Sequence, residues 1–580
     1  MLLVSLAPLF LLLASPDSFR MASMANLGLT TTESQIVSMV NGTEAYDYDL
    51  ELERIAYDHD LSNYSFRSAG SSGANATAEW LAQQFESLGL ETHTEQFQFT
   101  TWEVQSKPTL VIDEDNDPST TDDQTAIDSF QSTHYSWPTP PGGTFSDLVV
   151  LPLPPAADYY EVGSKTINQT EWNTINTTDK IVLIGREIRW ARSWELAYKN
   201  KLISQTPSAV VYTWWYDWMS FVPDFFSSAG GRPLSNLGPY YWSLEIPVGF
   251  VNYDDGLLIR TREDDLSVSA HVEIDSVIDS GSLCNVVAEL PGTKYPDKFV
   301  IVSSHYDTVM CSGFCDNGAG TAGVLEMARI FAEANRTGLL APKYTVLFVP
   351  FTGEEIGLVG AINYVIQHKM DMNNIVAVLN LDTIGSDNLA ITETDPATQF
   401  NLDELVSKAA ADLGISVLVD VPGGSDDEVF SDPSWANDFY SQLWSLTAGI
   451  SDATPVRSST CFFSYPSIYL EKWDTGIPGW MHTSYDNSTS TTTLNWVEAQ
   501  DLENHLKAVA LSTVRIVTPN PADINNDGSV DMKDIGYVAK RFLIIAADPL
   551  WDPAADINHD GKIDMRDIGY VARWFGQVEP

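Results

Sequence analysis

A chain of 580 residues, 44% of them hydrophobic, is long enough for several domains and can bury a large core. Its 31 basic and 79 acidic side chains give a formal net charge of −48 at pH 7. Such a charge repels nucleic acid and anionic membrane surfaces, so the composition argues against both as partners and indicates an acidic, solvated surface.

The first residues of the chain predict export. Residues 2–14 form an apolar run that is followed by Ser15, Pro16 and Asp17. This run is too short to span a bilayer and is typical of the core of a signal peptide. We therefore expect residues 1–25 to be a signal peptide and the protein to be secreted or attached to the cell surface. A short membrane anchor is the alternative, and no other segment reaches spanning length without charges.

The pattern of predicted elements changes between residues 142 and 143. Residues 33–142 begin with helix-like apolar spacing and contain an amphipathic helix at 76–88. Residues 143–278 contain short strand-like runs instead, at 180–184, 209–212 and 246–250. Aromatic side chains gather at 214–221, where they either line a groove for an extended substrate or form a packed mini-core. We expect residues 143–278 to be an inserted domain.

Three apolar runs in the next part of the chain each end in side chains that can bind a metal. These are His305 and Asp307 after the run 299–302, Glu354 and Glu355 after the run 344–351, and Asp382 after the run 375–381. The carboxyl ends of strands in an open α/β sheet form binding sites, so we expect these groups to meet at one sheet edge. Imidazole and carboxylate ligands together favour a borderline-hard cation, with zinc as the first choice.

The order of these motifs resembles that of the secreted di-zinc aminopeptidases, a superfamily that includes aminopeptidase Y, the bacterial leucyl aminopeptidases and glutamate carboxypeptidase II. The motifs are His-x-Asp at 305–307, Asp-Asn-Gly-x-Gly at 316–320, Gly-Glu-Glu at 353–355, Asn-x-Asp-x-Ile-Gly at 380–385 and a later histidine, His482. The resemblance implies an α/β fold in which helices flank a mixed sheet, with the catalytic part at residues 279–518. Residues 143–278 resemble, more loosely, the β-rich protease-associated domain that interrupts such peptidases.

The same resemblance implies a role for each ligand group. Asp316 bridges two zinc ions, His305 and Asp382 complete the site of one ion, and Glu355 and His482 complete the other. Each ion then has three protein ligands and keeps an open position, as catalysis requires.

Three neighbouring acids are expected to support these ligands. Glu354, adjacent to a ligand, is the expected general base, which takes a proton from the attacking water and passes it to the leaving amine. Asp307 is expected to orient the imidazole of His305 by accepting its second N–H, and Asp486 could do the same for His482.

The sequence departs from the family pattern in two places. Asp427 stands where the segment Gly-x-Ser-Asp-His-x-x-Phe has its histidine, and Met481 stands where relatives have a tyrosine that helps to hold the tetrahedral intermediate.

The four cysteines include Cys311 and Cys315, which could form a bridge that stiffens the loop before Asp316. A Cys-x3-Cys pair can also bind zinc, but such a site needs two more soft ligands nearby. We therefore expect structural or free thiols.

The end of the chain contains an internal repeat with a period of 33 residues, from Asp523 to Asp556. Oxygen ligands stand at loop positions 1, 3, 5, 9 and 12, and glycine stands at position 6, as calcium loops require. The predicted ligands are Asp523, Asn525, Asp527, Asp531 and Asp534 in the first loop, and Asp556, Asn558, Asp560, Asp564 and Asp567 in the second. The duplication and the aspartate at position 12 resemble a type I dockerin, a small α domain, over residues 519–580. Helices are expected at 535–542 and 568–575, and a cohesin-bearing scaffold is the implied partner.

Taken together, these signals predict a secreted metallo-exopeptidase that removes N-terminal residues from peptides and carries two zinc and two calcium ions. One alternative is an exopeptidase that resembles glutamate carboxypeptidase; it would need a basic pocket, and the motifs have no basic cluster nearby. The other alternative is a surface adhesion protein without catalysis, in which the dockerin is the functional part.

Overall fold

The computed structural model describes residues 29–59, 66–117, 119–120, 123–133, 136–152, 169–186, 200–214, 245–266, 268–309, 311–386, 388–392, 402–421, 425–432, 456, 459–465, 486–489, 497–525, 527–558 and 560–576. The expected signal peptide, the aromatic residues at 215–221, and Met481 and His482 lie outside these ranges, and of Trp214 only the backbone is described. Among the described residues, no helix has the length and apolar character needed to cross a bilayer.

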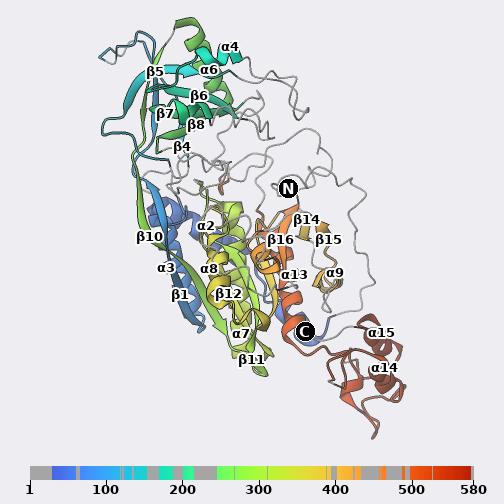
Figure 1. Ribbon diagram of the computed structural model, residues 1–580. Helices are drawn as coiled ribbons and strands as arrows, with labels where there is room; N and C mark the ends of the chain where they lie inside the picture. Colours follow the sequence, from blue (N-terminus) through green and yellow to red (C-terminus); the bar gives the residue numbers. More distant parts are fainter. Residues whose placement is uncertain are drawn as a thin grey trace.

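An eight-stranded mixed sheet forms the centre of the larger domain among the described residues (Figure 1). In spatial order its strands are β1 (Glu91–Val104), β10 (Ser276–Leu290), β12 (Tyr344–Phe351), β11 (Tyr295–His305), β13 (Ile375–Leu381), β16 (Ser459–Tyr465), β14 (Asn388–Thr392) and β15 (Val417–Val421). Strands β12, β11, β13 and β16 run parallel to one another, whereas β1 and β10 pair antiparallel along their full length. The expected α/β fold with a mixed sheet is confirmed.

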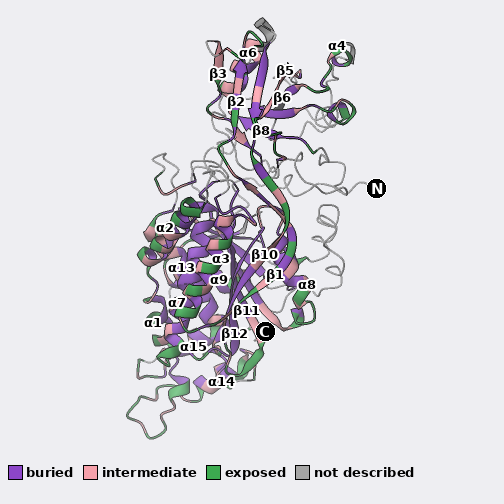
Figure 2. Cartoon of the chain, turned by 90° about the vertical axis from the view of Figure 1, so that its left-hand side faces the viewer, coloured by how far each residue is buried: buried purple, intermediate pink, exposed green. Residues whose placement is uncertain are grey.

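Helices cover both faces of this sheet, which explains why its central strands read as continuous apolar runs. Along β11, Val300 and Val302 point to one face and Ile301 to the other, as the two-residue period of a strand requires. The first face packs against α1 (Thr31–Val37), α2 (Gly42–His59), α3 (Ser72–Ser87), α7 (Gly320–Arg336), α9 (Leu402–Asp412) and α13 (Ala499–Val517). The second face packs against α8 (Val359–His368) and α10 (Asp427–Ser431). Figure 2 shows the buried sheet between these helical layers.

A second sheet of eight strands, within the described part of the chain, lies beyond the far ends of β1 and β10 (Figure 1). Its spatial order is β3 (Gln124–Ala126), β2 (Thr109–Asp113), β9 (Ser269–Glu273), β5 (Thr144–Val150), β6 (Ile181–Arg186), β7 (Ala209–Trp214), β8 (Val248–Val251) and β4 (Gln131–Ser132). Helices α4 (Gln169–Thr174) and α6 (Tyr253–Leu266) belong to the same region. Strands β2 and β4 lie before residue 143 but pair with β9 and β8 of this sheet, and β3 pairs with β2, so the sheet begins earlier in the chain than the expected boundary at residue 143.

The repeated tail forms a small helical unit with helices α14 (Met532–Ala539) and α15 (Met565–Arg573). Both helices begin three residues before the predicted starts. The reason is that Asp531 and Asp564, at loop position 9, cap the helices, while Asp534 and Asp567 complete a capping box. The isolated bridge between Ile545 and Lys562 joins the two halves of the repeat.

This tail is packed against the larger domain through charged side chains. Asp412, at the end of α9, accepts hydrogen bonds from Arg573 at 2.6 Å and from Arg515 of α13 at 2.7 Å. The side chains of all three residues are at least nine-tenths buried. Trp574 is also buried, and its ring lies 4.8 Å from Lys408 Nζ and 5.1 Å from the Arg515 guanidinium carbon. The second half of the repeat is therefore part of the larger domain's packing.

Replacing Asp412 by alanine is expected to destabilise the protein by about 3–5 kcal/mol, because the buried guanidinium group of Arg573 loses its ion-pair partner, whereas Arg515 keeps Glu33. Calorimetry of the full chain measures this effect as a lower unfolding midpoint. Glu333→Ala is the matched control, since Glu333 forms an exposed pair with Arg336 on α7. A change in the unfolding midpoint as small as that of Glu333→Ala would mean that the tail contact does not contribute to stability.

Candidate metal centre

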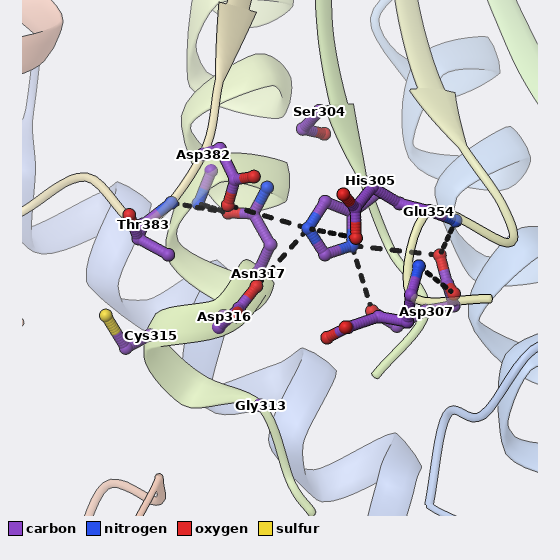
Figure 3. Close-up of polar contacts among 12 residues, drawn as sticks. Ser304, His305, Asp307, Gly313, Cys315, Asp316, Asn317, Glu354, Asp382 and Thr383 are labelled. Atoms are coloured by element: carbon purple, nitrogen blue, oxygen red, sulfur yellow. Dashed lines mark hydrogen bonds and ion pairs between the residues drawn. The ribbon is translucent and has the colours of Figure 1, made fainter. Parts of the chain in front are cut away.

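The three parallel strands β12, β11 and β13 bring the predicted ligand groups to one edge of the sheet. His305 is the last residue of β11 and pairs in register with Phe351, the last residue of β12. Asp382 directly follows β13, which pairs with the other side of β11. Figure 3 shows His305 at the centre of the site, with Asp316, Asp382 and Glu354 directed toward it.

The imidazole of His305 is fully buried and lies among carboxylates. Its Nε2 atom is 3.3 Å from Asp316 Oδ1, 3.5 Å from Asp382 Oδ1 and 3.9 Å from Glu354 Oε2. One ligand atom each from His305, Asp316 and Glu355 lies within 4.8 Å of the others. The structure thus brings together four of the five predicted zinc ligands, and the fifth, His482, lies outside the described residues.

The crowding of acids shifts the titration of the groups at this site. Burial alone would lower the pKa of His305, but the charges of Asp382 and Glu354 outweigh it and raise that pKa well above its usual value. Burial raises the pKa of the Glu354 carboxyl well above its ordinary value; His305 opposes this shift, and Glu355 and Asp382 add to it. The site concentrates negative charge in a buried place, which is unfavourable unless a cation is present.

Asp307 supports two elements of the site, and in a different way from the expected one. The atom nearest to His305 Nδ1 is the backbone oxygen of Asp307 at 3.1 Å, whereas the carboxylate atom Oδ1 is 3.7 Å away. That carboxylate accepts the backbone N–H groups of Glu354 at 3.2 Å and Glu355 at 3.4 Å. Asp307 therefore contacts both the histidine and the turn that carries the two glutamates.

Two glycines allow the close turns around the ligands. Gly353 has a φ of +70°, a left-handed conformation that turns the chain sharply between β12 and Glu354. At Gly320 a Cβ atom would lie 2.2 Å from Asn317 Oδ1 and 2.3 Å from the Leu381 carbonyl oxygen. Any side chain at this position would push apart the segments that carry Asp316 and Asp382.

Asn317 joins the loop of Asp316 to the end of β13. Its Nδ2 donates to the Leu381 carbonyl at 2.9 Å, and its Oδ1 accepts from Thr383 N at 3.2 Å and Gly320 N at 2.9 Å. The first two of these bonds are made by the residues on either side of Asp382. The asparagine of the Asp-Asn-Gly motif thus sets the spacing between two predicted ligands.

Sequence reasoning missed one acid beside the site, Asp426. It is fully buried, and neither carboxylate oxygen has a hydrogen-bond partner within the described part of the chain. Burial raises its pKa well above the usual value; His305 opposes the shift, whereas Asp307 and Asp382 add to it. The sequence did contain a signal, because Asp426 stands in the segment whose next residue, Asp427, replaces the family histidine. Asp427 itself turns back to accept Ser425 N at 2.9 Å.

The four cysteines are free thiols, so the bridge considered between Cys311 and Cys315 is not formed, in agreement with the expectation of structural or free thiols. Three of them are buried, and Cys284 is partly exposed. Burial raises the pKa of Cys315 well above its usual value, with Asp486 and Asp316 adding to the shift, which disfavours a reactive thiolate.

The donor set fits zinc. One imidazole and three carboxylates are ligands that zinc accepts, and they come from residues held in place by strands and short turns. The buried Oδ1 atom of Asp382 receives no hydrogen bond from any described residue, although it is only 3.5 Å from His305 Nε2. A buried carboxylate oxygen without a donor is costly unless a cation takes the donor's place.

The two repeated loops of the tail have the same internal hydrogen bonds. Asp527 N donates to Asp523 Oδ1 at 3.1 Å and to Asn525 Oδ1 at 2.8 Å. The equivalent bonds in the second loop, from Asp560 N to Asp556 and Asn558, measure 3.2 and 3.0 Å. The glycines at position 6 have φ values of +85° and +81°, as the sharp turn of a calcium loop requires.

Comparison with known families identifies two segments of the chain. Residues 285–502 match the model of peptidase family M28, and residues 521–575 match the model of the dockerin type I domain. The first match contains all of the predicted zinc ligands, and the second contains both predicted calcium loops.

Individual relatives and solved structures agree with these matches. The chain is 36% identical over 124 residues to a probable zinc metalloprotease of Pyrenophora teres f. teres and 37% identical over 145 residues to an aminopeptidase of Pseudomonas aeruginosa. These alignments cover 20% and 25% of this chain and span about a quarter of each relative. The fold is similar to that of BSAP, a zinc aminopeptidase from Bacillus subtilis, with a TM-score of 0.56 at 19% identity over 83% of this chain and 96% of that one. It is also similar to a peptidase M28 precursor from Shewanella amazonensis, with a TM-score of 0.54 at 16% identity over 84% and 96% of the two chains.

Proposed function

We propose that this chain, whose residues 285–502 belong to peptidase family M28 and whose residues 521–575 form a type I dockerin domain, is an exported zinc aminopeptidase. It would remove N-terminal residues from peptides and be held to a scaffold by its dockerin. The observation that carries the proposal is the meeting of His305, Asp316, Glu355 and Asp382 at one sheet edge, with the carboxylate of Glu354 beside them. Residues 1–25 would be the signal peptide, and the second sheet would be a protease-associated domain.

Two zinc ions would be held by five side chains in this proposal. Asp316 would contact both ions, His305 and Asp382 would complete one site, and Glu355 and His482 would complete the other. The zinc ions would supply Lewis-acid polarisation of the scissile carbonyl and make water a better nucleophile at neutral pH.

The side chains around the zinc site would then do the remaining work. Glu354 lies 3.9 Å from His305 Nε2 and is held by the bond from its own N–H to Asp307, so its carboxylate stays at the site without being needed as a ligand. It would accept the proton of the attacking water and return it to the leaving amine. Asp307 would fix the positions of His305, Glu354 and Glu355 relative to one another.

A substrate panel tests the proposed specificity. Aminoacyl-anilides should be hydrolysed, N-acylated peptides with a C-terminal glutamate should not, and a chelator should abolish turnover until zinc is restored. Hydrolysis of the N-blocked peptides instead would favour the carboxypeptidase alternative. Stoichiometric zinc without turnover of any substrate would favour the adhesion protein.

We also propose that each repeated loop of the tail binds one calcium ion through the ten oxygen ligands predicted above. Asp534 and Asp567, at position 12, are fully buried and accept backbone N–H groups of their own loops. Met532 and Met565 are about two-thirds exposed, each at the first position of the helix that follows a loop. Such exposed apolar side chains suit contact with a protein partner of the cohesin type.

Calcium is expected to stabilise the full chain by about 2.7 kcal/mol for a site at a hundredfold excess over its dissociation constant. Asp567→Ala should remove the contribution of the second loop, because it deletes the buried ligand at position 12. Thermal unfolding of the full chain with calcium and then with EGTA measures both effects. Asp548→Ala, which removes one negative charge outside both loops, is the control and should keep the full calcium response. If the unfolding midpoint of the parent chain is the same with calcium and with EGTA, the proposed calcium sites are wrong.

A further inference from the structure

The loop that carries Asp316 is also bonded by Asp486, a residue that was expected to orient His482. The carboxylate of Asp486 accepts two consecutive backbone N–H groups, from Cys315 at 2.6 Å and from Asp316 at 3.1 Å. Its backbone oxygen accepts the Ser312 hydroxyl at 2.7 Å. Asp486 is buried, so these bonds are protected from water.

Two bonds from one carboxylate to adjacent amides fix the backbone at Asp316 strongly. Charge-assisted hydrogen bonds of this kind are roughly twice as strong as neutral ones, and a bidentate pair also fixes an orientation. Asn317, the residue after Asp316, is bonded through its side chain to the end of β13. The backbone of Asp316 is therefore held on both sides.

The fold of this loop does not depend on Asp486 alone. The guanidinium group of the buried Arg67 donates to the backbone oxygens of Tyr306, Ser312 and Gly313 at 3.0, 2.7 and 3.0 Å. Glu53 of α2 accepts the Ser312 hydroxyl and Ser488 N, each at 3.0 Å. These contacts hold the path of the loop, whereas Asp486 binds the two amides at the predicted bridging ligand itself.

We propose that Asp486 is a positioning residue for Asp316: by holding the backbone there, it sets the direction of the carboxylate that is predicted to bridge the two ions. This inference rests on the proposed zinc site. It assigns to Asp486 a role at the bridge, in addition to any contact with His482.

Asp486→Asn tests the inference, because the amide keeps the shape but can accept only one of the two N–H groups. Zinc affinity should fall by roughly 10–100-fold, as is usual when a partner of a ligand is lost. The visible spectrum of the cobalt-substituted protein should change, and kcat should fall with little change in KM. The unfolding midpoint in the presence of EDTA, where neither chain holds zinc, should stay close to that of the parent chain.

Glu53→Gln is the matched comparison, since Glu53 bonds the same loop without touching the amides of Cys315 and Asp316. It should lower the unfolding midpoint and leave the cobalt spectrum unchanged. Parent-like zinc affinity and an unchanged cobalt spectrum in Asp486→Asn would overturn the positioning role and leave the proposed function standing. A parent chain that binds zinc without hydrolysing peptides would overturn the proposed function but not this inference, and one that binds no zinc would overturn both.

Discussion

Replacing Glu354 by glutamine is expected to lower kcat by roughly 10²–10⁴-fold, the range typical for loss of a general acid–base group. The amide keeps the size of the side chain and the backbone bond to Asp307, but it cannot accept a proton from water. Zinc content should stay that of the parent chain, because the adjacent Glu355 is the expected ligand. Steady-state kinetics on an aminoacyl-anilide, with metal analysis of the same sample, measures both quantities.

Glu79→Gln is the control for this substitution, since Glu79 lies on the exposed side of α3 and undergoes the same chemical change. It should leave kcat and zinc content unchanged. Near-parental kcat in Glu354→Gln would remove Glu354 from the role of base. Loss of one zinc ion in that variant would show instead that Glu354 is a ligand.

Asp316→Ala is expected to remove both zinc ions and to reduce hydrolysis to the background rate. Only a carboxylate shared between two ions serves both at once, so its deletion weakens both sites together. His305→Ala and His482→Ala should each weaken mainly one ion. Zinc stoichiometry after dialysis, measured for the three variants together, separates these outcomes.

The folded state of Asp316→Ala is checked by its unfolding midpoint in the presence of EDTA, where the parent chain is also free of zinc. The two chains should unfold at similar temperatures, because the loop keeps the bonds made by Arg67 and Asn317. Retention of two tightly held ions in Asp316→Ala would show that another residue bridges them.

Much of the central sheet could be predicted from the sequence because its strands are buried on both faces. The bounds of β12 and β13 agree with the predicted runs 344–351 and 375–381, since a strand without a solvent face has no polar interruptions. The ligand groups follow these runs directly, so placing the strands also placed His305, Glu355 and Asp382. Local sequence was sufficient for this part of the site.

The supporting contacts could not be predicted in the same way. The bonds of Asp486 reach amides 170 and 171 positions earlier in the chain, and spacing alone pointed to the nearby His482 instead. Two early strands of the second sheet, β3 and β4, are only three and two residues long, which is too short for a periodic signal. The starts of α14 and α15 were missed although the capping pattern was present, because Asp531 and Asp534 were considered only as calcium ligands.

The contact between Asp412 and the tail was also absent from the sequence prediction, because isolated charged residues normally lie on the surface. It decides how the protein would respond to a pulling force. A tail joined only by its backbone would pass all tension to the end of α13 at Val517, where a helix is peeled away most easily. Here Arg573 transfers part of the tension through Asp412 to α9 and to Arg515 in the last turn of α13. Tension applied at the tail is thus shared between α9 and α13 instead of acting on the end of α13 alone.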